Sequence, residues 1–462
     1  MFIGRKEELE LLNNLYNSSG FEFLILYGRR RIGKTFLLEE FAKSHKCIFF
    51  SAMEKNDSMN LSDFSELIQR YFEGDFIAPF QDWKKAFDYI GNKSDKEKVC
   101  LIIDEFPYIA QENPTVKSIL QHQIDKSWIN KNIKLILCGS NISYMEADGM
   151  GQRSPLYGRS TAQWEVKKFS YKEAAEFFPT YSYTDKLIAY GILGGIPRYL
   201  SEFNNNKSLK ENIKTKILTA GAFLKEEPLA LLRMEVREPN IYNSILQAVA
   251  SGTNRTSEIA SAIHEEQTKV GKYISILISL RFLTKVASCT ENPESKKGIY
   301  KISDNFFNFW YRYEFSNRNY YNLIGTDRAV DEIMDNINDY MGPVFESICQ
   351  QYLTYEAGAG KLPFIPYYFG RWWGNNPAIK AQDDVDILAL NKAKDKGIFC
   401  ECKFKNSKFD TKDFEDIIDS LKIFPSLQET WIYVFSKSGW TEGVQDISKD
   451  YNVKLITIED LF

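Results

Sequence analysis

The chain has 462 residues, a formal net charge of −4 and a hydrophobic content of 44%. This length is too great for one hydrophobic core, and the balance of apolar and charged residues excludes a disordered chain. The weak negative charge excludes attraction of nucleic acid by the whole surface, so any such binding would have to come from a local patch.

Signals for export or membrane insertion are not predicted. No apolar run approaches the roughly 18 residues of a membrane span, and the first residues, MFIGRKEELELL, carry charge where a signal peptide is apolar. The 7 cysteines are scattered and odd in number, which favours reduced thiols over disulfides. With only 3 His and no Cys-x-x-Cys pair, no zinc site is expected. We therefore expect a cytoplasmic protein.

The first motif is a glycine-bounded loop between a strand and a helix. Residues 21–27, FEFLILY, form an apolar run typical of a buried strand, and residues 36–44, FLLEEFAKS, have helical spacing. The loop between them, GRRRIGKT, has the G-x-x-x-x-G-K-[ST] spacing whose backbone N–H groups hold phosphate. Lys34 is expected to reach the β- and γ-phosphates of ATP, and Thr35 to bind Mg²⁺. The predicted nucleotide-binding residues here are Gly28, Arg29, Arg30, Arg31, Ile32, Gly33, Lys34, Thr35 and Phe36.

Two further apolar runs end in polar side chains. Residues 99–103, VCLII, precede Asp104 and Glu105, and an acid pair at the carboxyl end of a parallel strand faces the ligand crevice. Asp104 is expected to hold Mg²⁺ through water, and Glu105 to polarise the attacking water. The strand in KLILCGS ends at Ser140 and Asn141, either a γ-phosphate sensor or a simple turn.

Together the segments FIGR, LYGRRRIGKT, LIIDE, LILCGS and SPLYGRS resemble the archaeal-type ATPase domain of the AAA+ relatives grouped as STAND, which act as nucleotide-dependent switches. The resemblance implies that Gly4 and Arg5 lie near the adenine. It also implies that Pro197, in a Gly-Gly-x-Pro element of a helical lid, contacts the nucleotide. Arg159 matches a recurrent arginine of the family, either a phosphate sensor or a trans-acting finger; the residues alone indicate a surface or salt-bridged arginine.

The middle of the chain is predicted to be mainly helical. A helical lid is expected to about residue 237, and then three helices and a hairpin resemble a winged helix-turn-helix. DNA contacts would come from Lys269, Lys272 and the turn lysines 296 and 297. Residues 240–300 hold 7 Lys or Arg against 5 Asp or Glu, so protein contact is the alternative. The aromatic segment 306–315 is expected to pack in a core, with base stacking as the alternative.

The last 120 residues carry paired acids beside a lysine. DDVDILAL and GIFCECKFK are predicted strands, so Glu401 and Lys403 share one face and a hairpin would place Asp386 nearly opposite Glu401. Because paired acids repel, Mg²⁺ or Mn²⁺ held by Asp386 and Glu401 would explain the arrangement. Glu346, on a predicted helix, could complete the metal shell, and Lys403 could orient or deprotonate the water that attacks a phosphodiester.

The order helix-Glu, strand-Asp, strand-Glu-x-Lys, helix, strand resembles the restriction-endonuclease-like PD-(D/E)xK nucleases. GPVFE, FGRWW, DVDIL and ECKFK are also similar to a C-terminal domain of unknown function that archaea and bacteria attach to this ATPase. Val385 stands where the nuclease pattern has proline, a departure from the family. A fold that has lost cleavage, or a hairpin salt bridge of Lys403, is the alternative.

We therefore predict a multidomain α/β protein whose catalytic residues are Lys34, Glu105 and Lys403 and whose metal ligands are Thr35, Asp104, Glu346, Asp386 and Glu401. Five segments are expected: a P-loop NTPase αβα sandwich (1–165), a helical lid (166–238), a winged helix (239–312), linker helices (313–340) and a restriction-endonuclease-like domain (341–462). The predicted function is an ATP-hydrolysing switch whose effector cleaves nucleic acid, DNA rather than RNA, with a protein partner or homo-oligomer also considered. The alternative is a regulatory scaffold with an inactive nuclease-like domain, which a Lys403 ammonium already paired at the acids would favour.

Overall fold

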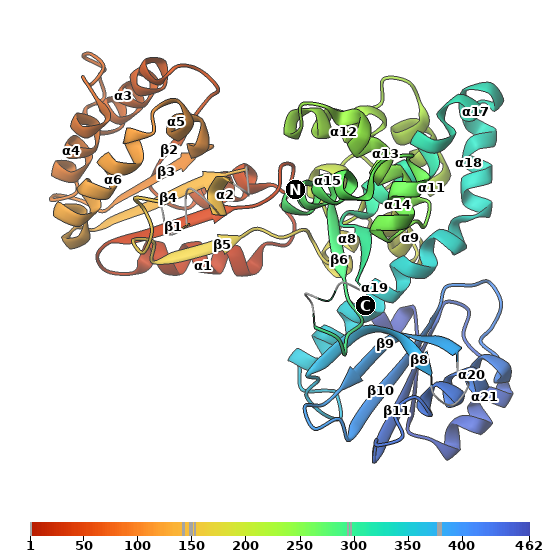
Figure 1. Ribbon diagram of the computed structural model, residues 1–462. Coiled ribbons are helices and arrows are strands. Elements are labelled where there is room, and N and C mark those ends of the chain that lie inside the picture. Colours follow the sequence, from red (N-terminus) through yellow and green to blue (C-terminus); the bar gives the residue numbers. More distant parts are fainter. Residues whose placement is uncertain are drawn as a thin grey trace. The chain divides into compact units, whose positions relative to one another are not determined.

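A computed structural model describes residues 2–140, 144–146, 151, 154–292, 295, 298–376 and 381–462. The chain forms two compact units, one of residues 1–168 with 196–198 and the other of residues 169–195 with 199–462 (Figure 1). In the described part of the chain, no helix combines the length and the apolarity needed to cross a membrane. The limits predicted for five separate domains remain predictions.

The first unit is built on a five-stranded sheet in the order β2-β3-β4-β1-β5, with every neighbouring pair parallel. Its strands are β1 (Glu22–Tyr27), β2 (Cys47–Ser51), β3 (Val99–Asp104), β4 (Ile133–Gly139) and β5 (Ala162–Glu165). β3 and β4 are buried along their whole length, as expected of central parallel strands. The predicted P-loop core is therefore confirmed as a parallel α/β fold.

Helices cover both faces of this sheet (Figure 1). They are α1 (Lys6–Asn17), α2 (Lys34–Lys43), α3 (Asp57–Glu73), α4 (Trp83–Lys93), α5 (Phe106–Glu112), α6 (Thr115–Lys126) and the short η1 (Trp128–Asn130). Phe23 and Ile25 share a core with aromatic side chains of α3 and α4. Leu24, which alternates with them along β1, lies on the other face beside Leu12 of α1 and Phe41 of α2.

The second unit opens with the helices predicted for the lid. They are α8 (Tyr171–Ala175), α9 (Tyr183–Leu193), α10 (Pro197–Leu200, whose first two residues belong to the first unit), α11 (Leu209–Ile213), the π-helical η3 (Lys214–Leu218) and α12 (Phe223–Glu235). Three helices and an antiparallel hairpin follow: α13 (Pro239–Ala250), α14 (Thr256–Ala262), α15 (Gln267–Ser279), β6 (Leu283–Val286) and β7 (Ile299–Ile302). This order of elements is the one predicted. Lys296 and Lys297 lie outside the described residues.

The aromatic segment 306–315 packs in the core of the second unit. Phe306, Phe307, Phe309, Trp310 and Tyr311 are fully buried, so these side chains are not available to stack on bases. The helices here are α16 (Asn305–Trp310), the π-helical η4 (Tyr311–Phe315), α17 (Ser316–Ile324), α18 (Thr326–Asp335) and α19 (Ile337–Gly358).

The chain ends in a mixed five-stranded sheet in the order β12-β11-β10-β9-β8. Its elements are β8 (Tyr368–Asn376), β9 (Ala381–Leu390), β10 (Lys396–Lys403), α20 (Thr411–Leu421), β11 (Glu429–Ser436), α21 (Glu442–Ile447), η5 (Ser448–Asp450), β12 (Val453–Thr457) and η6 (Glu459–Leu461). β8, β9 and β10 pair antiparallel, while β10, β11 and β12 pair parallel.

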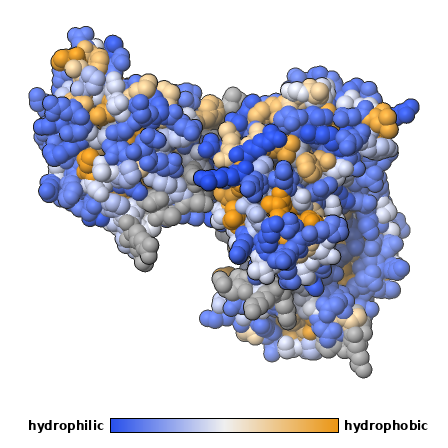
Figure 2. Space-filling view, turned by 45° about the horizontal axis from the view of Figure 1, so that its top comes forward, coloured by the Kyte–Doolittle hydropathy of each residue, from blue (hydrophilic) through white to orange (hydrophobic). Residues whose placement is uncertain are grey.

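The face of the molecule in Figure 2 is mainly hydrophilic, with apolar side chains in small separate areas. Large apolar residues that are more than half exposed include Met53, Ile77, Leu323 and Ile365. Such scattered residues are normal on a folded protein and do not by themselves mark a binding surface.

Candidate functional site

The phosphate loop runs from the end of β1 to the start of α2, as predicted. Gly28 needs to be glycine, because a Cβ there would lie 2.6 Å from the carbonyl oxygen of Val166. Gly33 adopts φ +89° and caps α2, so the loop enters the helix through a left-handed residue. Lys34 is buried and donates hydrogen bonds to the carbonyls of Gly28 at 2.9 Å and Arg29 at 3.3 Å. Burial lowers the pKa of Lys34, and negative charge from a phosphate would oppose that shift.

The acid pair lies beside this loop. The Thr35 hydroxyl donates to Oδ2 of Asp104 at 2.7 Å, so both predicted Mg²⁺ ligands of the first unit are brought together. Glu105 follows with φ +51°, and its Oε2 accepts from the hydroxyl of Ser140 at 3.0 Å and the backbone N–H of Ser140 at 3.3 Å. Ser140 is thus next to the acid pair and in contact with Glu105. Asn141 lies outside the described residues.

Arg5 makes contacts that its predicted role did not include. Its buried guanidinium donates to the carbonyl of Ile32 in the loop at 2.9 Å and to the carbonyl of Lys167 at 2.6 Å, and it pairs with Glu8 at 3.1 Å. Arg5 therefore ties the start of the chain to the phosphate loop. Gly4 precedes it with φ +66°, and Arg5 itself has φ +60°.

Pro197 and Phe36 lie around the same loop. A Cβ at Gly33 would lie 3.8 Å from Cγ of Pro197, so the predicted lid proline does reach the phosphate loop. Phe36 is 48% exposed and its ring centroid lies 5.6 Å from that of Phe2. An aromatic pair left open beside a nucleotide loop offers an apolar surface to a base.

The loop contains three arginines. The carbonyl oxygen of Arg29 accepts hydrogen bonds from the ammonium of Lys34 and from the backbone N–H of Ile32. Arg31 adopts φ +70° and is exposed. Arg30 lies between them in the loop. Backbone groups of this segment shape the phosphate cradle.

Arg159 is not brought to the loop. Its guanidinium forms a bidentate ion pair with Asp125, at 2.9 and 2.8 Å, near the end of α6. Arg159 precedes β5, whose first residue pairs with Leu24 in parallel, and Thr161 bonds to the backbone of Phe23. Arg159 thus lies toward the start of the strands, whereas the phosphate loop follows their carboxyl ends. The structure shows a salt-bridged arginine, as the residues alone indicated, and the predicted phosphate contact or trans-acting role of Arg159 stays a prediction.

In the second unit the predicted acids come together on neighbouring strands. Cys400 pairs with Ile387, which places Glu401 opposite Asp386 in the antiparallel ladder. Asp386 lies in a β-bulge, because two residues of β9 face the single residue Arg371 of β8. Its Oδ2 accepts from the backbone N–H of Cys402 at 2.8 Å. The predicted hairpin arrangement is therefore present, with a bulge that the sequence pattern did not indicate.

Glu346 on α19 completes this group, which we call the acid cluster: Glu346, Asp386 and Glu401. Burial raises the pKa of Glu401 to about 7, with repulsion from Asp386 adding to the shift. Burial also raises the pKa of Asp386 to about 6, with repulsion from Glu346 adding to the shift. Burial also raises the pKa of Glu346, against the opposing charge of Arg371. Concentrated negative charge of this kind is relieved by a bound cation.

Each acid already has a partner in the protein. Lys403 pairs with Oε1 of Glu401 at 2.5 Å, and Arg371 pairs with Glu346 at 3.2 Å. Within the described residues, no three carboxylate, thiol or imidazole groups converge closely enough to hold a metal ion. Metal binding at the acid cluster would therefore require Lys403 to leave Glu401. The carboxylate oxygens suit Mg²⁺ in chemical type, while their present pairing is the one expected of the scaffold alternative.

Two cations of this site were missed by the sequence analysis. Arg371 joins Glu346 to Asp384, which it contacts at 2.6 Å, and Lys301 of β7 lies near Glu346, Asp386 and Arg371. The segment FGRWW was noticed for its resemblance, but nothing in its spacing indicates an arginine opposite a bulge. Lys301 belongs to a different segment of the chain, so only the fold brings it here.

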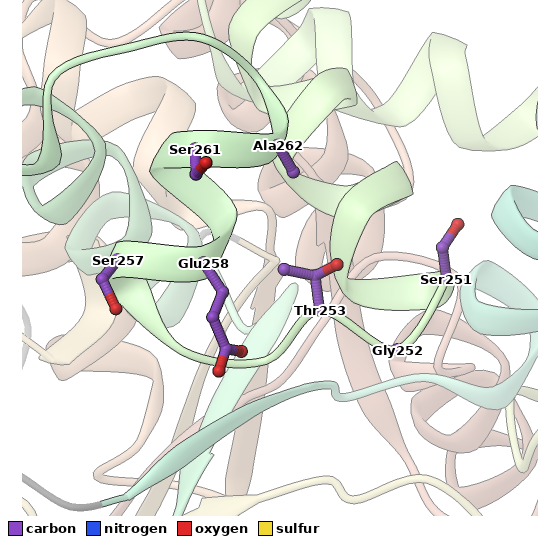
Figure 3. Close-up of a pocket in the computed structure, with 7 residues that line it drawn as sticks. All are labelled: Ser251, Gly252, Thr253, Ser257, Glu258, Ser261 and Ala262. Carbon is purple, nitrogen blue, oxygen red and sulfur yellow. The ribbon is translucent and has the colours of Figure 1, made fainter.

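The predicted DNA contacts on α15 are exposed. Lys269 pairs with Glu265 at 2.9 Å, and Lys272 lies one turn further along the helix. Nearby, an open hollow lies between the end of α13 and α14 (Figure 3). It is lined by Ser251, Gly252, Thr253, Ser257, Glu258, Ser261 and Ala262. None of these lining residues is basic, so the hollow does not provide a site for phosphate.

Comparison with known proteins agrees with this architecture. Residues 2–203 match a family described as an ATPase domain predominantly from Archaea, and residues 310–417 match archaeal and bacterial proteins of unknown function. The uncharacterized protein MJECL04 of Methanocaldococcus jannaschii is 34% identical over 411 residues, 88% of either chain. The uncharacterized ATP-binding protein MJ0423 of the same organism is 50% identical over 46 residues, 10% of this chain and 78% of that protein.

Among solved structures, the Walker-type ATPase PABY2304 of Pyrococcus abyssi is 19% identical, with a TM-score of 0.52, and the match covers 67% of this chain and 96% of that one. This likeness supports the fold. The chain thus carries an ATP-binding, Walker-type ATPase domain. Because a relative is 34% identical along most of its length, the protein belongs to the family that joins an archaeal-type ATPase domain to a C-terminal domain of unknown function.

Proposed function

We propose that the protein is an ATP-hydrolysing switch whose C-terminal domain acts on nucleic acid. The observation that carries the first part is the joint placement of Lys34, Thr35 and Asp104 at the carboxyl ends of β1 and β3. The ammonium of Lys34 is placed to bind a phosphate in the loop, and the Thr35 hydroxyl and Asp104 carboxylate are placed to bind the Mg²⁺ that accompanies it.

In the ATP-bound state Lys34 would leave the carbonyls of Gly28 and Arg29 for the β- and γ-phosphates. Thr35 and Asp104 would hold Mg²⁺, which neutralises charge on the phosphates. Glu105, which is bonded to Ser140 through one carboxylate oxygen, would polarise the attacking water.

The C-terminal domain is proposed to be restriction-endonuclease-like and to cleave phosphodiesters with Mg²⁺ or Mn²⁺. What supports this is the placement of Glu346, Asp386, Glu401 and Lys403 near one another on one helix and two strands, in the order of the PD-(D/E)xK pattern, although the three carboxylates would have to move closer together to share a metal. Asp386, Glu401 and Glu346 would hold the metal, which stabilises the leaving oxygen. Lys403, released from Glu401, would orient or deprotonate the attacking water.

Coupling between the two activities is proposed to run through α19. Its Tyr340 hydroxyl donates to the carbonyl of Gly191 in the lid helix α9 at 2.7 Å, and the same helix carries Glu346. The lid continues from α9 through Gly194 and Gly195 to Pro197. Closure of the lid on ATP would thus shift the helix that presents Glu346, reorient the winged helix, and expose or dock the acid cluster.

The second candidate is a regulatory scaffold whose C-terminal domain binds DNA or protein without cleavage. The ion pairs of Lys403 with Glu401 and of Arg371 with Glu346 favour it, because they satisfy the acids without metal.

The two candidates differ in a cleavage assay. Plasmid, single-stranded DNA and RNA would be incubated with the protein and Mg²⁺ or Mn²⁺, with and without ATP. We expect cleavage by the wild type and by the control Lys405→Ala, and no cleavage by Lys403→Ala. In Lys34→Ala we expect the cleavage to lose its dependence on ATP. Intact ATP turnover with no cleavage of any substrate would replace the nuclease with the scaffold.

A further inference from the structure

The acid cluster is bordered by a hairpin from outside the C-terminal sheet. β8 is the edge strand of that sheet, and the segment after β6 lies along it: the N–H of Cys289 donates to the carbonyl of Arg371 at 2.9 Å, and the N–H of Trp373 donates to Oγ of Ser288 at 3.1 Å. The first contact is made by Arg371, the residue opposite the bulge that holds Asp386, and the second is made two residues further along β8. Figure 1 shows β6 reaching toward this sheet.

This docking places Lys301 of β7 at the acid cluster. The groups that act on its ammonium are Glu346, Asp386 and Arg371, and burial lowers its pKa. The backbone of Lys301 pairs with Thr284 in the hairpin, but, unlike the other two cations of the site, its ammonium forms no hydrogen bond or ion pair with any residue that the structure describes. Arg371 is held by Glu346 and Asp384, and Lys403 is held by Glu401.

A half-buried ammonium without hydrogen bonds is unfavourable unless an anion approaches it. The neighbouring carboxylates are already bonded to other groups, so they do not supply that anion at hydrogen-bond distance. A phosphate of a substrate at the acid cluster would do so, and a lysine binds phosphate as a point charge without demanding one geometry.

We propose that Lys301 of the β6–β7 hairpin is a phosphate-contacting residue of the C-terminal site, so that a nucleic-acid backbone is held jointly by the hairpin and the C-terminal sheet. This inference rests on the proposed action of the C-terminal domain on nucleic acid. It identifies the site as shared between two segments of the chain, which gives the middle segment a direct means of controlling substrate binding.

The test is binding of fluorescein-labelled DNA, single-stranded and duplex, to the full chain, with Ca²⁺ in place of Mg²⁺ to prevent cleavage. Anisotropy would be measured over a series of KCl concentrations for the wild type and three variants. Lys301→Met keeps the apolar stem and removes the charge. Lys301→Arg keeps the charge. Lys285→Met is the matched control, because Lys285 pairs with Tyr300 and so lies on the other face of the hairpin.

We expect Lys301→Met to weaken binding about threefold to tenfold near 0.1 M salt and to lower the slope of log affinity against log salt by about 1. Lys301→Arg and Lys285→Met should retain the wild-type slope. If the wild type binds DNA and Lys301→Met has the same slope, the shared site is overturned while the proposed function stands. If the wild type binds neither DNA, the proposed function fails and this inference fails with it.

Discussion

Replacing Arg5 with methionine should weaken nucleotide binding through the shape of the phosphate loop. The guanidinium donates to the carbonyls of Ile32 and Lys167 at 2.9 and 2.6 Å. Hydrogen bonds from a charged donor contribute about 1.5–3 kcal/mol each, so about 3–6 kcal/mol holds this corner of the loop. In the variant, hydrogen bonds from water would replace part of this free energy. If only about 1.4 kcal/mol of it is lost from nucleotide binding, the affinity falls tenfold.

The assay is calorimetric titration of Arg5→Met with non-hydrolysable analogues of ATP and GTP and with tripolyphosphate, each with Mg²⁺. Positioning of the loop predicts a loss of at least about tenfold for all three ligands, because all three place phosphates in the same cradle. Lys6→Met, an exposed neighbour, is the control and should bind as the wild type does. A loss confined to the ATP analogue would refute the reasoning and show instead that Arg5 contacts the adenine.

Three further perturbations test other parts of the structure. Gly28→Ala should abolish ATP binding, because its Cβ would meet the Val166 carbonyl at 2.6 Å; retained binding by calorimetry would contradict this. Glu401→Gln should stabilise the metal-free protein by about 2 kcal/mol more at pH 8 than at pH 5.5. The pKa of the Glu401 carboxyl is about 7 in the folded protein, above its pKa in the unfolded chain. Ionisation therefore destabilises the fold increasingly as the pH rises from the unfolded pKa toward 7. Chemical unfolding at the two pH values measures the difference. Arg159→Ala should leave ATP affinity unchanged in titrations of the monomer and cost under about 1 kcal/mol, since its partner is an exposed acid; an affinity loss would place Arg159 at the nucleotide.

Much of the first unit could be predicted because its chemistry is local in sequence. The strand, loop and helix around Lys34 are contiguous, and parallel strands bring their carboxyl ends to one edge, where Asp104 bonds to Thr35 and Ser140 bonds to Glu105. The position of Arg159 was harder to predict, because a match to a sequence motif does not show at which end of a strand the matched arginine will lie.

In the C-terminal sheet, alternation along a strand predicted that Glu401 would face Asp386. It could not predict the bulge at Asp386, which depends on how β8 and β9 pair, nor the partners that Arg371 and Lys301 find at long range. The pairing of Lys403 with Glu401 was foreseen only as one of two alternatives. Whether a lysine or a metal occupies the same carboxylate depends on the free energies of the ion pair and of metal binding. The spacing of residues in the sequence does not reveal these free energies.

Metal binding at both sites can be tested by anomalous diffraction from crystals of the full chain grown with Mn²⁺ and a non-hydrolysable ATP analogue. We expect two anomalous peaks, one between Thr35 and Asp104 beside the phosphates and one between Asp386 and Glu401, with Lys403 turned away from Glu401. A peak at the phosphate loop alone, with Lys403 still paired to Glu401, would contradict metal-dependent cleavage and leave the protein as an ATP-dependent scaffold.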